Sequence, residues 1–200
     1  MNRDRIERIV CQMKEHNLTQ IIISDPESIY YLLGRKVFAL ERVGVLLIQQ
    51  NGEVHAFMNK MLMFRPIEGV ILHEHDDGDN VYAEIASYLQ PGTVGYDKNW
   101  SAGHAISVMK ESEDTVPEIG SVVIDLVRAV KNEEEKQVLR HAAALDDSAM
   151  AYGISNISTE LTEVDLSNMI EKFFVDNGCE PTPYVQCVSY GATAADPHHF

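Results

Sequence analysis

Two segments of the sequence bring together residue types that can do chemistry. The first, residues 73–79 (HEHDDGD), has two histidines at i and i+2 followed by carboxylates. Histidines two apart on a strand point to the same side, and together with carboxylates they are typical ligands of a divalent metal. The structural alternative, which we favour, is a strand that ends in an acidic loop, with Asp79 or Asn80 capping the next helix. A metal site would also need hydrogen-bonded residues around its ligands.

The second segment, residues 189–200 (SYGATAADPHHF), combines small residues with a histidine pair. Small residues let a backbone approach a ligand closely, and Pro197 fixes the entry to His198 and His199. A histidine placed there could donate a hydrogen bond or a proton near pH 7. Spacing alone favours the alternative, a frayed end of the chain with two solvated histidines.

The cysteines and the common motifs indicate no other reaction centre. Cys11, Cys179 and Cys187 are far apart and form no CxxC pair, so neither a disulfide framework nor a zinc site is indicated. We expect reduced thiols, with Cys187 in the core. A P-loop, a GxGxxG after a strand, GxSxG and HExxH do not occur in the sequence.

Charge and composition limit the classes of partner. The 200 residues carry 31 acidic and 16 basic side chains, a formal net charge of −15. Such a surface repels phosphate backbones and anionic lipid, so we expect neither nucleic acid nor a membrane as a partner. No apolar run approaches the ~20 residues of a membrane span, and no apolar stretch follows the basic residues at the N-terminus. We therefore expect a cytoplasmic protein.

The elements that must position these segments alternate between helix and strand over the first 110 residues. Apolar spacing predicts helices over residues 3–16, 26–34, 81–89 and 101–109, and strands over 20–24, 43–48, 54–58, 70–72 and 93–96. Asn51-Gly52 marks a hairpin between two of the strands. The alternation predicts a compact α/β domain with a largely parallel or mixed sheet.

Long helices follow in the second part of the sequence. Asn132 begins one helix, with three glutamates in its first turn, and Thr162 begins another that ends at Gly178. Beyond them we predict a single strand, residues 184–190, which is too little to close a core. We place the domain boundary within residues 125–131 and expect the second unit to be incomplete.

Three segments, taken in order, resemble elements of one enzyme family. They are residues 29–34 (IYYLLG), residues 128–135 (RAVKNEEE) leading into 139–143 (LRHAA), and residues 189–199 (SYGATAADPHH). The first resembles the YLTG element of an N-terminal domain, the second the helix that opens a catalytic domain, and the third an SG-N-A-PHH segment. The family is that of creatinase, prolidase and aminopeptidase P, the pita-bread metallopeptidases and relatives, and Xaa-Pro dipeptidases resemble the chain most.

The resemblance implies an α/β fold in two parts. Residues 1–128 would form a creatinase-like N-terminal domain with a mixed sheet. Residues 129–200 would form the incomplete start of an α+β pita-bread domain, with two long helices and one strand. The family activity nearest to these motifs is hydrolysis of the bond before proline, in a dipeptide or at a peptide N-terminus. There, two divalent ions, usually Mn²⁺, Co²⁺ or Zn²⁺, activate a water.

The resemblance also marks residues of the site. His198 matches a catalytic histidine beside the metals, which is expected to stabilise the tetrahedral intermediate by hydrogen bonding. The family's metal ligands, two aspartates, a histidine and two glutamates, follow the PHH segment, and this chain ends at Phe200 before the first of them. We therefore expect no metal bound by this chain and no peptidase activity from it alone, with two ions in the full-length enzyme.

Family members are often homodimers in which the N-terminal domain reaches over the partner's active site. The resemblance makes the loop after Gly34 the candidate for that contact, and its basic pair, Arg35 and Lys36, could hold a substrate carboxylate. A solvated loop is an equally good interpretation. Two other functions stay open: a non-catalytic binding or dimerisation module of the same fold, and a metal-independent, creatinase-like hydrolase.

Overall fold

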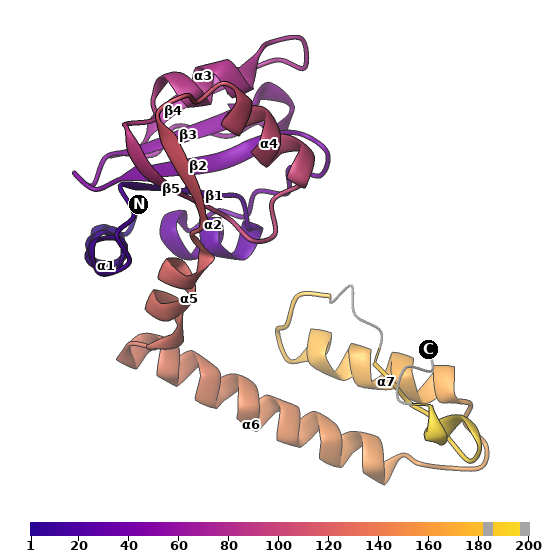
Figure 1. Ribbon diagram of the computed structural model, residues 1–200. Coiled ribbons are helices and arrows are strands. Elements are labelled where there is room, and N and C mark those ends of the chain that lie inside the picture. The colour runs from indigo at the N-terminus through magenta and orange to yellow at the C-terminus, as the bar shows by residue number, and fades with distance from the viewer. Residues whose placement is uncertain (182–185, 197–200) are drawn as a thin grey trace. The chain divides into compact units, whose positions relative to one another are not determined.

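A computed structural model describes residues 1–181 and 186–196 of the chain (Figure 1). The chain divides into two compact units, Met1–Val130 and Lys131–Phe200. The first contains a sheet covered by helices on both faces, and the second contains two long helices. In the described part of the chain, no helix has both the length and the apolar composition needed to cross a bilayer.

A mixed six-stranded sheet forms the centre of the first unit, in the order β4-β3-β2-β1-β5-β6. The strands are β1 (Gln20–Ile23), β2 (Gly44–Gln49), β3 (Val54–Asn59), β4 (Ile71–His75), β5 (Gly92–Tyr96) and β6 (Thr115–Ile119). Strand β2 pairs antiparallel with β1 and β3, and the other neighbouring pairs are parallel. The predicted mixed α/β fold is therefore confirmed.

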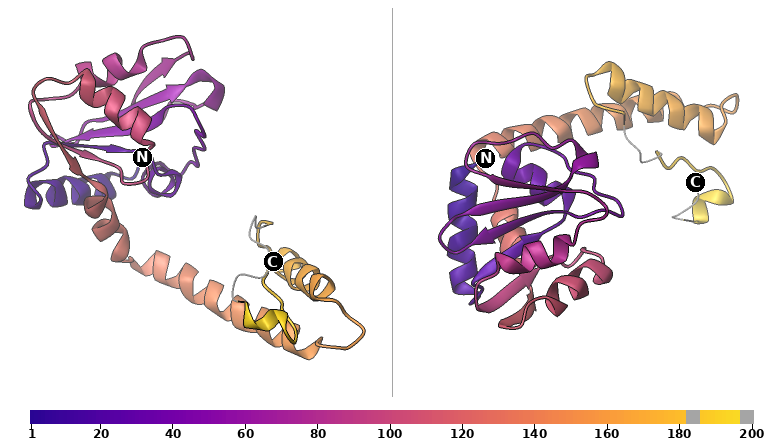
Figure 2. Two further views of the ribbon diagram at one scale, coloured as in Figure 1. Left: turned by 45° about the vertical axis from the view of Figure 1, so that its right-hand side comes forward. Right: turned by 90° about the horizontal axis from the view of Figure 1, so that it is seen from above.

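Helices cover both faces of this sheet (Figures 1 and 2). They are α1 (Arg3–Glu15), α2 (Pro26–Leu33), α3 (Val81–Ser87), α4 (Ala102–Lys110) and α5 (Ser121–Ala129), with a short 3₁₀ turn, η1 (Lys60–Leu62). Side chains of α1, α2 and α5 pack into one apolar cluster, and those of α3 and α4 into another. Because side chains alternate along a strand, Ile21 and Ile23 enter the first cluster and Ile22 the second.

The local signals in the sequence place most of these elements correctly. Asp25 caps α2 by accepting a hydrogen bond from the Ser28 N–H, and Gly34 ends the helix in the left-handed conformation. The turn at Asn51-Gly52 joins the antiparallel strands β2 and β3, as predicted. Of the two candidate caps before α3, Asn80 is the one used.

Strand β6 and helix α5 are the elements of the first unit that the sequence did not predict. Strand β6 contains Pro117, which interrupts a strand pattern, but β6 lies at the edge of the sheet, where proline is tolerated. Helix α5 follows Gly120, which supplies no side-chain cap. The chain is helical as far as Ala129, so most of the boundary region at residues 125–131 is part of the first unit.

The second unit contains the two predicted long helices, α6 (Glu133–Ser155) and α7 (Glu163–Asp176), and a 3₁₀ turn, η2 (Thr193–Ala195). Both long helices begin with a reciprocal capping box, Asn132 with Glu135 and Thr162 with Asp165. The rings of Tyr152 and Phe173 lie 5.0 Å apart and pack one helix against the other.

Two predictions for the end of the chain are wrong. Residues 186–190 do not form the strand expected over residues 184–190, whose positions 184 and 185 lie outside the described residues. A strand needs a neighbour to pair its backbone groups, and no described segment of this unit offers one. Cys187 is exposed rather than in the core for the same reason, because without a sheet its neighbours cannot enclose it.

The backbone of Gly95 in β5 lies close to that of Gly120, just before α5. This close approach predicts how adding one methyl group at Gly95 affects stability. A Cβ on Gly95 would lie 2.8 Å from the Gly120 Cα and 2.9 Å from Leu18 Cδ1. We expect Gly95→Ala to lower the free energy of unfolding of the first unit by about 1–3 kcal/mol through overpacking. Urea unfolding followed by the fluorescence of Trp100, the single tryptophan, measures this unit.

Gly78→Ala is the matched control for this prediction. A Cβ there would meet nothing within 4 Å, and the residue does not have a positive φ. We expect its stability to be unchanged or slightly raised. Equal destabilisation by the two substitutions would show that the close approach of Gly95 and Gly120 is not the cause.

Candidate functional site

The basic pair predicted to contact substrate lies at the surface of the first unit. Arg35 and Lys36 are both exposed in the loop after α2. The Arg35 Nη1 donates a hydrogen bond to the backbone oxygen of Arg65 at 3.2 Å. The Lys36 ammonium lies 5.7 Å from the centre of the Tyr30 ring, a cation–π contact. These contacts restrain the two exposed side chains.

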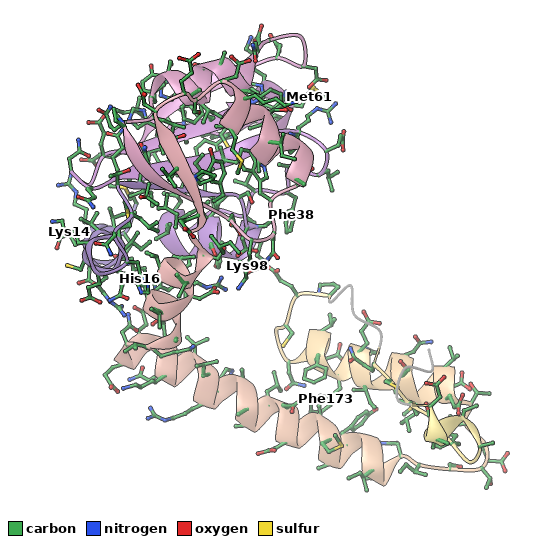
Figure 3. The ribbon with its side chains drawn as sticks, viewed as in Figure 1. Lys14, His16, Phe38, Met61, Lys98 and Phe173 are labelled. Atoms are coloured by element: carbon green, nitrogen blue, oxygen red, sulfur yellow. The ribbon has the colours of Figure 1, made fainter. Side chains whose placement is uncertain are left out.

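Apolar side chains are exposed beside this basic pair. Phe38 is 60% exposed and Leu40 is 87% exposed, and Met61 and Met63 on the adjoining segment are 70% and 83% exposed. Figure 3 shows Phe38 and Met61 at the surface of the first unit. The Arg35–Arg65 hydrogen bond joins the loop after α2 to the segment that follows η1.

The histidines of residues 73–79 are used in packing. His73 Nε2 and His55 Nδ1 face each other at 3.0 Å, so one ring donates a hydrogen bond and the other accepts it. The His73 ring also stacks on Phe57, with centroids 4.5 Å apart. His75 is buried, and its Nε2 lies 3.2 Å from the backbone oxygen of Val43. The contacts support the structural interpretation of this segment.

The surroundings of His73 lower the pKa of its ring. Burial and the neighbouring His55 lower the pKa of His73, and Glu84, whose carboxylate lies 3.5 Å from Nδ1, opposes them in part. On the other side of the His55 ring, a Glu53 oxygen lies 2.9 Å from Nε2, but the angle does not suit a hydrogen bond. Within residues 1–181 and 186–196, no group of three or more histidine, cysteine, aspartate or glutamate side chains could hold a metal ion.

A buried carboxylate occupies the carboxyl ends of β1 and β5, where parallel strands of α/β folds commonly place functional groups. Asp97 is 7% exposed, and its Oδ2 accepts hydrogen bonds from the backbone N–H groups of Ser24 and Asp25 at 3.0 and 2.9 Å. Its Oδ1 accepts from the Ser121 hydroxyl and the Asn99 N–H, both at 3.1 Å. Because both oxygens are saturated by the protein, this carboxylate positions the chain rather than a ligand.

The segment that leads to the predicted catalytic histidine lies along α7. Glu163 accepts hydrogen bonds from the Tyr190 N–H at 2.6 Å and from the Thr193 hydroxyl. One turn later on the same helix, the Ser167 hydroxyl donates to the Gln186 oxygen at 2.8 Å. His198 itself lies outside the described residues, as does the rest of the PHH sequence.

Sequence reasoning missed Glu163 and Ser167. Thr162 and Asp165 give a visible start signal for the helix, but no local pattern connects Glu163 with Tyr190, 27 positions away. Only the three-dimensional structure shows this connection.

Comparison with known proteins identifies both parts of the chain. The family model of the creatinase/prolidase N-terminal domain matches residues 5–130, and that of metallopeptidase family M24 matches residues 137–200. The chain belongs to the creatinase/prolidase family. This confirms the resemblance found from the three sequence segments.

Individual members of the creatinase/prolidase family align with nearly all of this chain. Relatives from Staphylococcus aureus (strain USA300) and Staphylococcus haemolyticus (strain JCSC1435), both named uncharacterized peptidases, are 24% and 26% identical over 204 residues. Each alignment covers 97% of this chain and 56% of the relative. The chain therefore spans little more than half the length of these curated relatives.

Solved structures of the family share the fold. A dipeptidase from Mycobacterium ulcerans superimposes with a TM-score of 0.86 at 22% identity, over 98% of this chain and 54% of that chain. A prolidase from Thermococcus sibiricus gives a TM-score of 0.74 at 20% identity, over 89% of this chain and 51% of that chain. The fold is thus a creatinase-type N-terminal domain followed by the start of an M24 domain.

The lowered pKa of His73 predicts that the first unit loses stability in acid. The unfolded chain binds a proton at the ordinary histidine pKa, near 6.5, whereas folded His73 resists protonation. Its contribution is therefore complete above about pH 6.5 and is lost as the pH falls below that value. We expect His73→Phe to flatten the fall in unfolding free energy between about pH 7.5 and about pH 5, measured by urea unfolding with Trp100 fluorescence.

His16→Phe is the control for this pH dependence. His16 is exposed at the end of α1 (Figure 3), so the substitution removes a histidine without disturbing the His55–His73 pair. An acid slope in His73→Phe as steep as in the wild type would contradict the assignment.

Proposed function

We propose that the complete gene product is an Xaa-Pro peptidase that cleaves the bond before proline in a dipeptide or at a peptide N-terminus. The observation that carries the proposal is the match of residues 137–200 to metallopeptidase family M24. The structural likeness to a prolidase and a dipeptidase supports a proline-containing dipeptide or short peptide as the substrate.

The two parts of the chain have different proposed roles. Residues 1–128 are the N-terminal domain, and residues 129–200 are the start of the catalytic domain. His198 is the proposed catalytic residue, which stabilises the tetrahedral intermediate by hydrogen bonding to its oxyanion. Support comes from the sequence, in which His198 follows the residues that α7 anchors, Gln186 and Tyr190.

Two divalent ions, Mn²⁺, Co²⁺ or Zn²⁺, are the proposed cofactors of the complete enzyme. The described residues do not fit them, because residues 1–181 and 186–196 contain no cluster of three or more suitable ligands. Hard and borderline ions need several carboxylate and imidazole ligands. We therefore assign no step of metal chemistry to the described residues, and we expect this 200-residue chain to be inactive alone.

We further propose a cytoplasmic homodimer in which Arg35 and Lys36 contact the substrate bound by the partner. The exposed cations and the exposed Phe38 of the same loop support a surface that meets both a carboxylate and another protein chain. The free cysteines support a reducing compartment.

The activity itself is testable with two dipeptides. The complete gene product, loaded with Mn²⁺, is expected to release proline from Ala-Pro and to leave Ala-Ala intact. A chelator should reduce the rate to background, and added metal should restore it, because the metal supplies the activated water. Proline release is measured by chromatography.

Other results of this assay would favour one of the alternative functions or contradict part of the proposal. Hydrolysis that survives chelation would favour the metal-independent, creatinase-like enzyme, and a folded but inactive gene product would favour the binding module. Chelator-sensitive cleavage by the purified 200-residue chain would contradict the expectation that it lacks activity alone.

The role of the basic pair has its own prediction. We expect Arg35→Ala/Lys36→Ala to raise KM for Ala-Pro about tenfold with little change in kcat, because the lost contacts bind the substrate and transition state equally. The difference should disappear with Ala-Pro amide, which lacks the carboxylate. Arg3→Ala/Lys14→Ala, which removes two exposed charges from α1, is the control. An equal KM change in the control, or persistence with the amide, would contradict this role.

A further inference from the structure

The first residue of α7 is hydrogen-bonded to the segment that precedes the PHH sequence. Oε1 of Glu163 accepts from the Tyr190 N–H at 2.6 Å and from the Thr193 hydroxyl. The Thr193 hydroxyl lies 2.7 Å from the Tyr190 oxygen as well. Since it has one hydrogen, it donates to the carboxylate, which is the stronger acceptor. One charged group therefore fixes both sides of the turn at residues 190–193.

A second contact lies on the same face of the helix. Ser167 is four residues after Glu163, and its hydroxyl donates to the Gln186 oxygen at 2.8 Å. Residues four apart on a helix share a face. The returning chain is thus held at residue 186 and again at residues 190 and 193.

Polar contacts matter for residues 191–195 because this stretch has little apolar surface to bury. Gly191, Ala192, Ala194 and Ala195 are all exposed. Gly191, inside the turn, has a φ of 54°, a left-handed conformation that glycine adopts readily. Charge-assisted hydrogen bonds are stronger than neutral ones, so Glu163 is a strong constraint on the position of this turn.

We propose that Glu163 is a positioning residue for the catalytic segment. Glu163 fixes the turn at residues 190–193, and His198 follows in the sequence five positions beyond Thr193. The inference rests on the role proposed above for His198. Glu163 touches neither substrate nor metal in this scheme, and it acts through the backbone.

Steady-state kinetics of the complete gene product test the proposal. We expect Glu163→Ala to lower kcat for Ala-Pro by about tenfold to a hundredfold, the equivalent of one charge-assisted hydrogen bond, and to leave KM nearly unchanged. Glu163→Gln retains an acceptor oxygen without the charge, so its kcat should lie between those of Glu163→Ala and the wild type. If Glu163→Ala does not fold, the kcat values of Glu163→Gln and Thr193→Val are compared with that of the wild type instead.

Asp165→Asn separates positioning from helix stability. Asp165 accepts from the Thr162 N–H at 3.0 Å and from its hydroxyl, and these bonds lower the pKa of Asp165. The substitution weakens the start of α7 without touching the turn, so kcat should stay close to that of the wild type. An unchanged kcat in Glu163→Ala, or an equal loss in Asp165→Asn, would overturn the proposal.

Hydrogen exchange of the Tyr190 amide gives a readout that does not depend on activity. We expect this amide to be protected in the wild type, to exchange faster in Glu163→Ala, and to remain protected in Asp165→Asn. A wild-type protein without peptidase activity would refute the proposed function. The exchange rates of the Tyr190 amide would still show whether Glu163 holds the turn at residues 190–193. An unprotected Tyr190 amide in the folded wild type would overturn the inference.

Discussion

The architecture of the first unit depends on one carboxylate that the solvent hardly reaches. Asp97 follows β5, and it receives hydrogen bonds from the backbone after β1 and from Ser121, the first residue of α5. A buried carboxylate is tolerated when several donors satisfy it, and a charge-assisted bond contributes about 1.5–3 kcal/mol. Its contacts join two strands and a helix at one point. The far end of α5 is fixed independently, because Arg128 bonds to Asp25 at 3.2 Å and Ser28 at 3.0 Å.

The two units are stabilised in different ways. The first closes two apolar clusters on either side of its sheet, with side chains such as Ile22 and Phe57 fully buried. In the second, apolar side chains of α6 and α7 are largely exposed: Val138, Leu139, Met150, Ile154 and Val164. Apolar burial contributes roughly 25 cal/mol per Å², so an exposed stripe of this kind contributes little. The capping boxes and the few packed residues, Tyr152 and Phe173 among them, hold these helices.

Sequence reasoning succeeded where the determinant was local. The Asp25-Pro26 start of α2, the Asn51-Gly52 turn and the cap at Asn132 involve groups only a few residues apart. It failed where a partner lay far along the chain, as for edge strand β6 and for residues 186–190, since a strand exists only with a neighbour to pair with. The same limit applies to the site. The resemblance identified the family, but Asp97 meets Ser24 across 73 positions, a distance that no local pattern records.

The contrast between the units explains why polar contacts matter most near the predicted catalytic histidine. In the first unit, two apolar clusters add close packing to the hydrogen bonds that Asp97 accepts. Residues 191–195 include exposed alanines and a glycine, so packing contributes little to the position of this stretch. Geometry there depends on hydrogen bonds with Glu163 and Ser167 of α7. A site built on small residues admits a ligand close to the backbone, but it needs a charged group such as Glu163 to define where that backbone lies.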